Sequence, residues 1–171
     1  RVRNGFPAET HRILEEGVTR MLDFQDREYA NAYLDRVAPI AGLDRDQGGG
    51  AIGYKLTNET GRFLALWMSY EDLIRVADLK SRRSRFERVR AEVQAKPHEP
   101  VHIIEYLKPG VEEAAAVLPP FLSKRLVAWT EKHGLTHKLN VGIYLKSTGI
   151  MGFLMLRLLA ALRPLRRMTA R

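Results

Sequence analysis

The chain has 171 residues, 45% apolar and 28% charged, which is enough for an ordinary folded domain and excludes a wholly disordered chain. It contains no cysteine, which excludes disulfide bonds, thiolate nucleophiles and cysteine-ligated iron–sulfur clusters within these residues. It shows no signal segment and no apolar run of the roughly 20 residues that span a bilayer, so we expect a piece of a soluble, cytoplasmic protein.

Two amphipathic helices are predicted in the first 40 residues. The first begins near Pro7, and one buried stripe is expected to contain Leu14, Val18, Met21 and Leu22. The second has Asp26 as its N-cap and is expected to end or kink at Pro39. Its buried face is expected to contain Tyr29, Tyr33, Val37 and Ile40. A few residues join the two patterns, which predicts an antiparallel helical hairpin.

A glycine-rich segment, residues 42–53, follows the hairpin. Gly48, Gly50 and Gly53 match the spacing G-x-G-x-x-G, but no hydrophobic strand precedes them, as a dinucleotide site requires. The segment also lacks the Lys-Ser/Thr pair of a phosphate-binding P-loop. We therefore interpret it as a flexible loop.

A helical pattern extends from Thr57 to Val93. Ser69 and Asp72 form an S-x-x-D start signal that would divide this stretch into two helices. One apolar face is expected to contain Leu73, Val76, Leu79, Phe86 and Val93. The cations between these residues would then point away from the core.

Two prolines within residues 96–100 mark the best internal boundary, because they prevent helix continuation. We expect a helical half, 1–95, and a smaller half, 101–171, with two strands and three helices, together forming one compact domain. The first strand is predicted at 101–107 and is expected to be well buried. The second is predicted at 139–146, where alternating apolar residues indicate a half-buried strand. Both parallel and antiparallel pairing of the two strands remain open. The predicted fold class is mainly α (α+β).

Three helices are predicted in the smaller half, at 111–118, from Pro120 to about Lys132, and at 150–162. The last is apolar almost all round and, at about 20 Å, too short to cross a membrane. We expect a core helix. Docking onto a missing partner domain, or an interfacial membrane helix, are the alternatives.

The positive charge is concentrated in two stretches. Residues 80–90 carry six cations against Glu87, and residues 157–171 carry five cations and no acid. A solvated helix face and a basic tail would account for them, and contact with an acidic partner or a phosphate-rich ligand is the functional alternative. The candidate anion- or partner-binding residues are Lys80, Arg82, Arg83 and Arg85. Only Phe86 is available there to stack a base, so nucleic acid is not the expected partner.

No motif of catalysis or metal binding is recognisable. The five histidines lack metal-ligand spacing, and no serine nucleophile motif is present, so we assign no catalytic and no metal residue. One candidate cluster between the two halves consists of Tyr70, Glu71, Asp72 and His102. An independent small enzyme would use that cluster, but a helix-start acid with a Glu71–Arg75 pair is the simpler interpretation.

Several whole segments carry a family resemblance. They are residues 57–72 (TNETGRFLALWMSYED), 73–80 (LIRVADLK), 84–90 (SRFERVR), 105–113 (EYLKPGVEE) and 152–159 (GFLMLRLL). Together they resemble the C-terminal region of the beta subunit of indolepyruvate ferredoxin oxidoreductase. The likeness extends from about Met21 to Leu165 and is weak in the glycine-rich segment.

The resemblance implies a parent enzyme of the 2-oxoacid:ferredoxin oxidoreductase family. Such an enzyme oxidatively decarboxylates aryl 2-oxoacids to the acyl-CoA and passes electrons to ferredoxin, using thiamine diphosphate, magnesium, iron–sulfur clusters and CoA. This segment has neither cluster ligands nor a diphosphate motif. We therefore expect a non-catalytic accessory domain that contacts other domains or subunits of the parent. The alternative is a basic helical module that binds CoA or nucleic acid.

Overall fold

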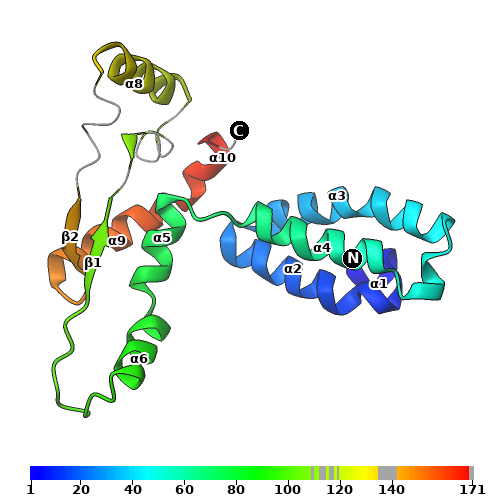
Figure 1. Cartoon of the computed structure of the whole chain (residues 1–171), viewed down its shortest axis with the longest axis horizontal. Coiled ribbons are helices and arrows are strands. Elements are labelled where there is room, and N and C mark those ends of the chain that lie inside the picture. Colours follow the sequence, from blue (N-terminus) through cyan, green and yellow to red (C-terminus); the bar gives the residue numbers. More distant parts are fainter. Residues whose placement is uncertain (109, 112–114, 116–117, 119, 135–141, 170–171) are drawn as a thin grey trace. The chain divides into compact units, whose positions relative to one another are not determined.

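The computed structural model describes residues 1–108, 110–111, 115, 118, 120–134 and 142–169 (Figure 1). The chain divides into two compact units, Arg1–Tyr70 and Glu71–Arg171. Helices dominate both, and in the described residues the only sheet is a two-stranded one in unit 2, which confirms the predicted mainly α class with a small β element. The boundary expected at residues 96–100 lies inside unit 2. The boundary between the units instead lies after Tyr70, between a helix that ends at Met68 and one that begins at Leu73.

Unit 1 is a bundle of three helices that pack pairwise against one another (Figure 1). A short helix and a 3₁₀ turn, α1 (Val2–Gly5) and η1 (Ala8–Thr10), precede the bundle. The bundle helices are α2 (His11–Phe24), α3 (Arg27–Asp46) and α4 (Lys55–Met68). The side chain of Asp26 accepts a hydrogen bond from the amide of Tyr29 at 3.0 Å, which confirms it as the N-cap of α3.

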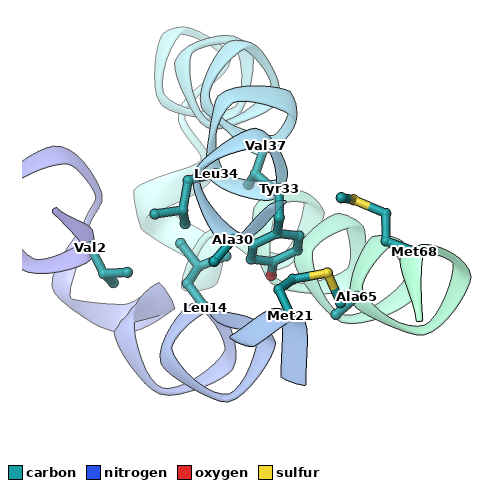
Figure 2. Packing of buried hydrophobic residues seen from close by; sticks show 9 residues of the cluster. All are labelled: Val2, Leu14, Met21, Ala30, Tyr33, Leu34, Val37, Ala65 and Met68. Carbon is teal, nitrogen blue, oxygen red and sulfur yellow. The ribbon is translucent and has the colours of Figure 1, made fainter. Parts of the chain in front are cut away.

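The core of unit 1 surrounds Tyr33, whose side chain points from α3 towards Leu14 and Met21 of α2 (Figure 2). All three side chains are fully buried. The Tyr33 hydroxyl donates to the carbonyl oxygen of Gly61 at 3.0 Å, and a Cβ at Gly17 would lie 2.4 Å from that hydroxyl oxygen. Two glycines thus allow the phenol to fit between α2 and α4.

Three expectations for unit 1 were wrong in detail. Helix α2 begins at His11, after the 3₁₀ turn, and not near Pro7. Leu22 is 44% exposed and does not belong to the buried stripe. Helix α3 does not end at Pro39 but continues to Asp46, because Pro39 lies on the exposed face, where water can bind the carbonyl oxygen that its missing N–H leaves free.

The glycine-rich segment connects α3 to α4 through the 3₁₀ turn η2 (Gly49–Ile52). Gly48 and Gly53 have φ values of 77° and 65°, which favour glycine. Asp44 of α3 accepts hydrogen bonds from the amide and the hydroxyl of Thr57, at 2.9 and 2.7 Å. A helix, and not a strand, therefore precedes the glycines, and a carboxylate already caps the amino end of α4.

Unit 2 is built around α5 (Leu73–Ser81), which packs along α9 (Ile150–Ala161). Asp72 caps α5 by accepting from the amide of Arg75 at 2.6 Å, so the division of the long helical stretch near residues 69–72 is confirmed. The other elements are α6 (Arg83–Glu92), β1 (Ile104–Leu107), α8 (Pro120–Lys132), β2 (Ile143–Lys146), η3 (Arg163–Leu165) and α10 (Arg166–Thr169).

Strands β1 and β2 pair antiparallel, with Ile104 opposite Lys146 and Leu107 opposite Ile143, which decides the question that the sequence left open (Figure 1). Residues 139–141 of the predicted second strand, and most of the predicted helix 111–118, lie outside the described residues. The prediction that the apolar residues of the first strand are well buried was wrong. In β1 the charged Glu105 is buried, while Ile104 is 63% exposed.

The predicted apolar face of residues 73–93 was also wrong. The buried residues of α5 are Ile74, Ala77 and Ser81, whereas Val93 is exposed and α6 has no buried residue. The physical reason is the extended backbone of Arg82 (φ −75°, ψ 138°), which separates α5 from α6, so that no continuous helical face runs through both.

Helix α9 is not the core helix that its composition predicted. Only Gly152 and Leu156 are buried in it, and Ile150, Met151 and Leu158 are 70–80% exposed. Gly152 is required where α9 crosses β2, because a Cβ there would lie 2.2 Å from the carbonyl oxygen of Lys146. Within the described residues, every helix is too short or too polar to cross a membrane.

Candidate functional site

The strongest concentration of chemically active side chains in unit 2 lies where α5, α6 and β1 meet. Glu105 of β1 has a side chain only 8% exposed, and it forms ion pairs with two cations. Lys80 Nζ lies 2.5 Å from one carboxylate oxygen, and an Arg85 guanidinium nitrogen lies 2.6 Å from the other. The break between the helices at Arg82 makes both ion pairs possible, because it places the end of α5 and the first turn of α6 against the same strand.

A second carboxylate holds the residue at the break. Arg82 Nε donates to Asp78 Oδ2 at 3.1 Å, and a further Arg82 nitrogen contacts the same oxygen. Arg75 lies 3.4 Å from this oxygen as well. Asp78 therefore fixes the guanidinium of Arg82 beside the α5–α6 junction.

Three of the four predicted anion-binding residues line one cavity of about 570 Å³, which we call the basic cavity. Its other lining residues include Glu71 and Arg88. The fourth predicted residue, Arg83, does not line it: its side chain is 92% exposed and pairs with Glu87 at 2.6 Å. The structure thus brings Lys80, Arg82 and Arg85 together and leaves Arg83 on the open surface.

The charge of the basic cavity is largely balanced within the protein. Glu105 faces Lys80 and Arg85, and Asp78 faces Arg82. Arg88 has the loosest of these contacts, 3.6 Å from Glu92 with both side chains more than 60% exposed. An incoming anion would therefore compete with carboxylates at three cations and meet Arg88 with little competition.

The four residues of the predicted cluster, Tyr70, Glu71, Asp72 and His102, are divided between the two units. Tyr70 belongs to unit 1, where its ring packs against Phe24 with centroids 5.3 Å apart. Asp72 is used as the cap of α5 and as the partner of Arg166. His102 is exposed, and in the described part of the chain no contact joins it to Asp72.

Sequence reasoning missed Glu105 and Arg166, the two charged residues that unit 2 buries most deeply among those described. Glu105 was identifiable in principle, because it is the only acid inside an apolar run predicted as a strand. Arg166 carried no local signal, since its partner is 94 residues away. Among the described residues, no group of three His, Asp or Glu side chains converges as metal ligands do.

Several large apolar side chains are exposed together on α4 of unit 1 and on α8 and α9 of unit 2. Helix α4 exposes Phe63, Leu66 and Trp67, the last by 79%. Helix α8 exposes the regularly spaced Leu122, Leu126 and Trp129, and the exposed residues of α9 are Ile150, Met151, Phe153, Leu154, Met155 and Leu158. Apolar exposure on this scale is typical of interaction surfaces.

Comparison with known proteins gives a family and no activity. No curated protein and no solved structure matches the chain. Residues 10–170, which include nearly all of both units, match the model of a family of unknown function, DUF6537. The chain therefore belongs to the DUF6537 family.

Proposed function

We propose that the chain is a non-catalytic accessory domain of an indolepyruvate (aryl-pyruvate) ferredoxin oxidoreductase subunit. The observation that carries the proposal is the exposed apolar face of α9. Part of this face lies within residues 152–159, one of the segments on which the resemblance to that enzyme rests. Leu154, Met155 and Leu158 of this segment are 46–70% exposed. The apolar area of such residues is removed from water only when another surface covers them.

A second segment of the resemblance has the same property. Residues 57–72 contain the exposed Phe63, Leu66 and Trp67 of α4, although the opposite face of that helix is buried in the bundle through Gly61, Ala65 and Met68. The resemblance therefore includes residues that unit 1 does not need for its own core. A contact with another polypeptide surface explains why apolar residues occupy those positions.

The sequence bears on one group of the parent's expected cofactors, the iron–sulfur clusters. Iron–sulfur clusters need cysteine thiolates, of which the chain has none, and the described residues hold no convergent set of ligands for a metal ion. In this proposal, thiamine diphosphate, magnesium, the clusters and CoA are held by other regions of the parent. The accessory domain would contribute contact surface and shape the access to that catalytic region, and ferredoxin would meet the parent and not this chain.

Association with the rest of the oxidoreductase tests the proposal. The chain is mixed with the remaining regions of an indolepyruvate ferredoxin oxidoreductase, and the complex is followed by size-exclusion chromatography together with the turnover of indolepyruvate. We expect co-elution, and we expect Leu158→Asp to weaken it by about tenfold or more through burial of a charge. Ala91→Asp is the matched control, because Ala91 is exposed on α6, which has no buried residue.

Two results would contradict the accessory role. One is the absence of association together with unchanged turnover of an oxidoreductase that lacks this region. The other is equal weakening by Leu158→Asp and Ala91→Asp, because an apolar contact through α9 must distinguish them.

The second candidate function, binding of a phosphate-rich ligand such as CoA, is favoured by one observation: Lys80, Arg82, Arg85 and Arg88 line a single cavity. We expect CoA to bind with an affinity that falls as salt rises, and Arg88→Gln to weaken binding more than Arg83→Gln, since Arg83 lies outside the cavity. Calorimetric titration measures both. Affinity that is insensitive to salt and to removal of the charge at Arg88 would exclude this function, and binding of an oligonucleotide in place of CoA would reassign it.

A further inference from the structure

Helix α6 separates the basic cavity from a second one of different character, which we call the apolar cavity. It measures about 370 Å³, within the range of small-molecule sites. It lies between α6, the segment before β1, the turn after β2 and the start of α9. Its lining includes Phe86, Arg90, Val101, Ile103, Ile150 and Phe153. All of these elements belong to unit 2.

The aromatic wall of the apolar cavity is formed by Phe86 of α6 and Phe153 of α9. Their ring centroids are 6.2 Å apart and their planes are inclined by 51°. Rings at this separation and tilt contact each other, so they leave no parallel slot into which a third ring could stack. A flexible alkyl chain can instead lie across the two rings and against Ile150.

Arg90 is the one charged residue that lines the apolar cavity in the described part of the chain. Its guanidinium donates to the carbonyl oxygens of Lys96 and Glu99, at 2.6 and 3.0 Å, and these acceptors are neutral. Within the described residues, no carboxylate lies within ion-pair distance of Arg90. The hydrogen bonds hold the guanidinium in place without cancelling its charge, and a monoanion would complete the pairing.

Two further groups at the cavity favour an anion. The hydroxyl oxygen of Thr148 accepts from the amide of Ile103 at 3.1 Å, which leaves its own proton free to donate. Gly149 and Ile150 lie at the amino end of α9, where the helix dipole is positive and no side chain caps the helix. These groups add to Arg90 and would not suffice alone.

We infer that the apolar cavity binds a medium-chain fatty acid, with its alkyl chain on Phe86, Phe153 and Ile150 and its carboxylate beside Arg90. A fatty acid is the occupant that fits, because the cavity combines apolar walls, one uncancelled cation and, among the described residues, no acidic lining residue. It is independent of the accessory role: Phe153 lines the cavity, whereas Leu158, the residue that tests the accessory role, does not.

Calorimetric titration of the whole chain with decanoate tests the inference, with decan-1-ol and acetate as matched ligands that lack the charge or the chain. We expect saturable binding of decanoate and at least about tenfold weaker binding of either matched ligand. Ile150→Asp should weaken decanoate binding at least about tenfold by repulsion and by loss of apolar contact. The acid at the first position of α9 favours the helix, so this variant should fold.

Met151→Asp is the matched control. Met151 is also 80% exposed and also lies in the first turn of α9, but it does not line the cavity. Amide chemical shifts of residues 147–150 should respond to decanoate in the unmodified chain. Absence of saturable binding, equal affinity for decanoate and decan-1-ol, or equal weakening by Ile150→Asp and Met151→Asp would each overturn the inference.

Discussion

Arg166 binds Asp72 through two charge-assisted hydrogen bonds, 2.7 Å from Nε to Oδ2 and 2.8 Å from a terminal nitrogen to Oδ1. The side chains are only 5% and 17% exposed. Asp72 also caps α5 through the amide of Arg75. One carboxylate thus joins the start of α5 to the C-terminal α10, and its role is to hold unit 2 together.

Replacement of Arg166 by Ala should destabilise unit 2 by about 3 kcal/mol, because it leaves a largely buried carboxylate without its cation. Asp72→Ala should cost at least as much, since it also removes the helix cap. Urea unfolding followed by Trp129 fluorescence, in a Trp67→Phe background, measures the change. The control Arg83→Gln breaks an exposed pair and should stay within about 0.5 kcal/mol. A similarly small effect of Arg166→Ala would contradict this prediction.

Replacement of Glu105 by Ala should be strongly destabilising, by about 3–5 kcal/mol, because Lys80 and Arg85 then face each other without a carboxylate. The same unfolding experiment measures it. The control is the triple variant Lys80→Met, Arg85→Met and Glu105→Leu, which removes all three charges and should lie within about 1 kcal/mol of the unmodified chain or be more stable. If the single and triple variants were equally unstable, packing and not charge would explain the loss.

The stability of unit 1 should fall between pH 10 and pH 12. Burial raises the pKa of Tyr33 to about 12 from its ordinary value of 10. Below pH 10 both the folded and the unfolded chain keep the phenol proton, so its contribution to stability is complete there. Between pH 10 and 12 the unfolded chain loses the proton and the folded chain retains it, so about 3 kcal/mol of stability is lost.

Urea unfolding at several pH values from 9 to 12 measures this loss, with Tyr33→Phe as the comparison. The variant should lose about 1 kcal/mol at neutral pH, since it removes the hydrogen bond to Gly61. Above pH 10, however, the free energy of unfolding of the variant should decline less steeply than that of the unmodified chain. Identical declines in the two proteins would show that another group titrates.

Two Gly→Ala substitutions should change stability in opposite directions. Gly152→Ala places a Cβ 2.2 Å from the backbone oxygen of Lys146, so α9 must shift and unit 2 should lose about 1–3 kcal/mol. Gly42→Ala lies within α3 with no atom near the new Cβ, and should stabilise unit 1 by about 0.5–1 kcal/mol. Thermal unfolding monitored by circular dichroism checks both. A stabilising Gly152→Ala would show that α9 is free to move off β2.

Much of the local structure was predictable because its causes are local. The caps at Asp26 and Asp72 act on amides three residues away, and the spacing of Leu14 and Met21 identifies α2 without knowledge of its partner. Pro39 shows the limit of this reasoning. Its tendency to end a helix is real, but burial of Ala41 and Asp44 beyond it keeps α3 folded.

The candidate site was predictable only in part. The basic stretch correctly indicated the region in which Lys80, Arg82 and Arg85 gather, but it also included Arg83, which points elsewhere. Residue order does not show that Arg82 interrupts the helix and so changes which cations face β1. It also does not show that Glu105, 20 residues after Arg85, forms ion pairs with two of them.

Composition and periodicity alone determined that this chain is mainly helical, where most of its helices lie and that it contains a small β element, because backbone propensities and caps act over a few residues. Only the tertiary structure decided the antiparallel pairing of β1 and β2, the ion pair between Arg166 and Asp72, and the exposure of α9. These features depend on contacts between residues far apart in the chain, and an apolar helix has the same sequence pattern whether its partner lies within the chain or elsewhere.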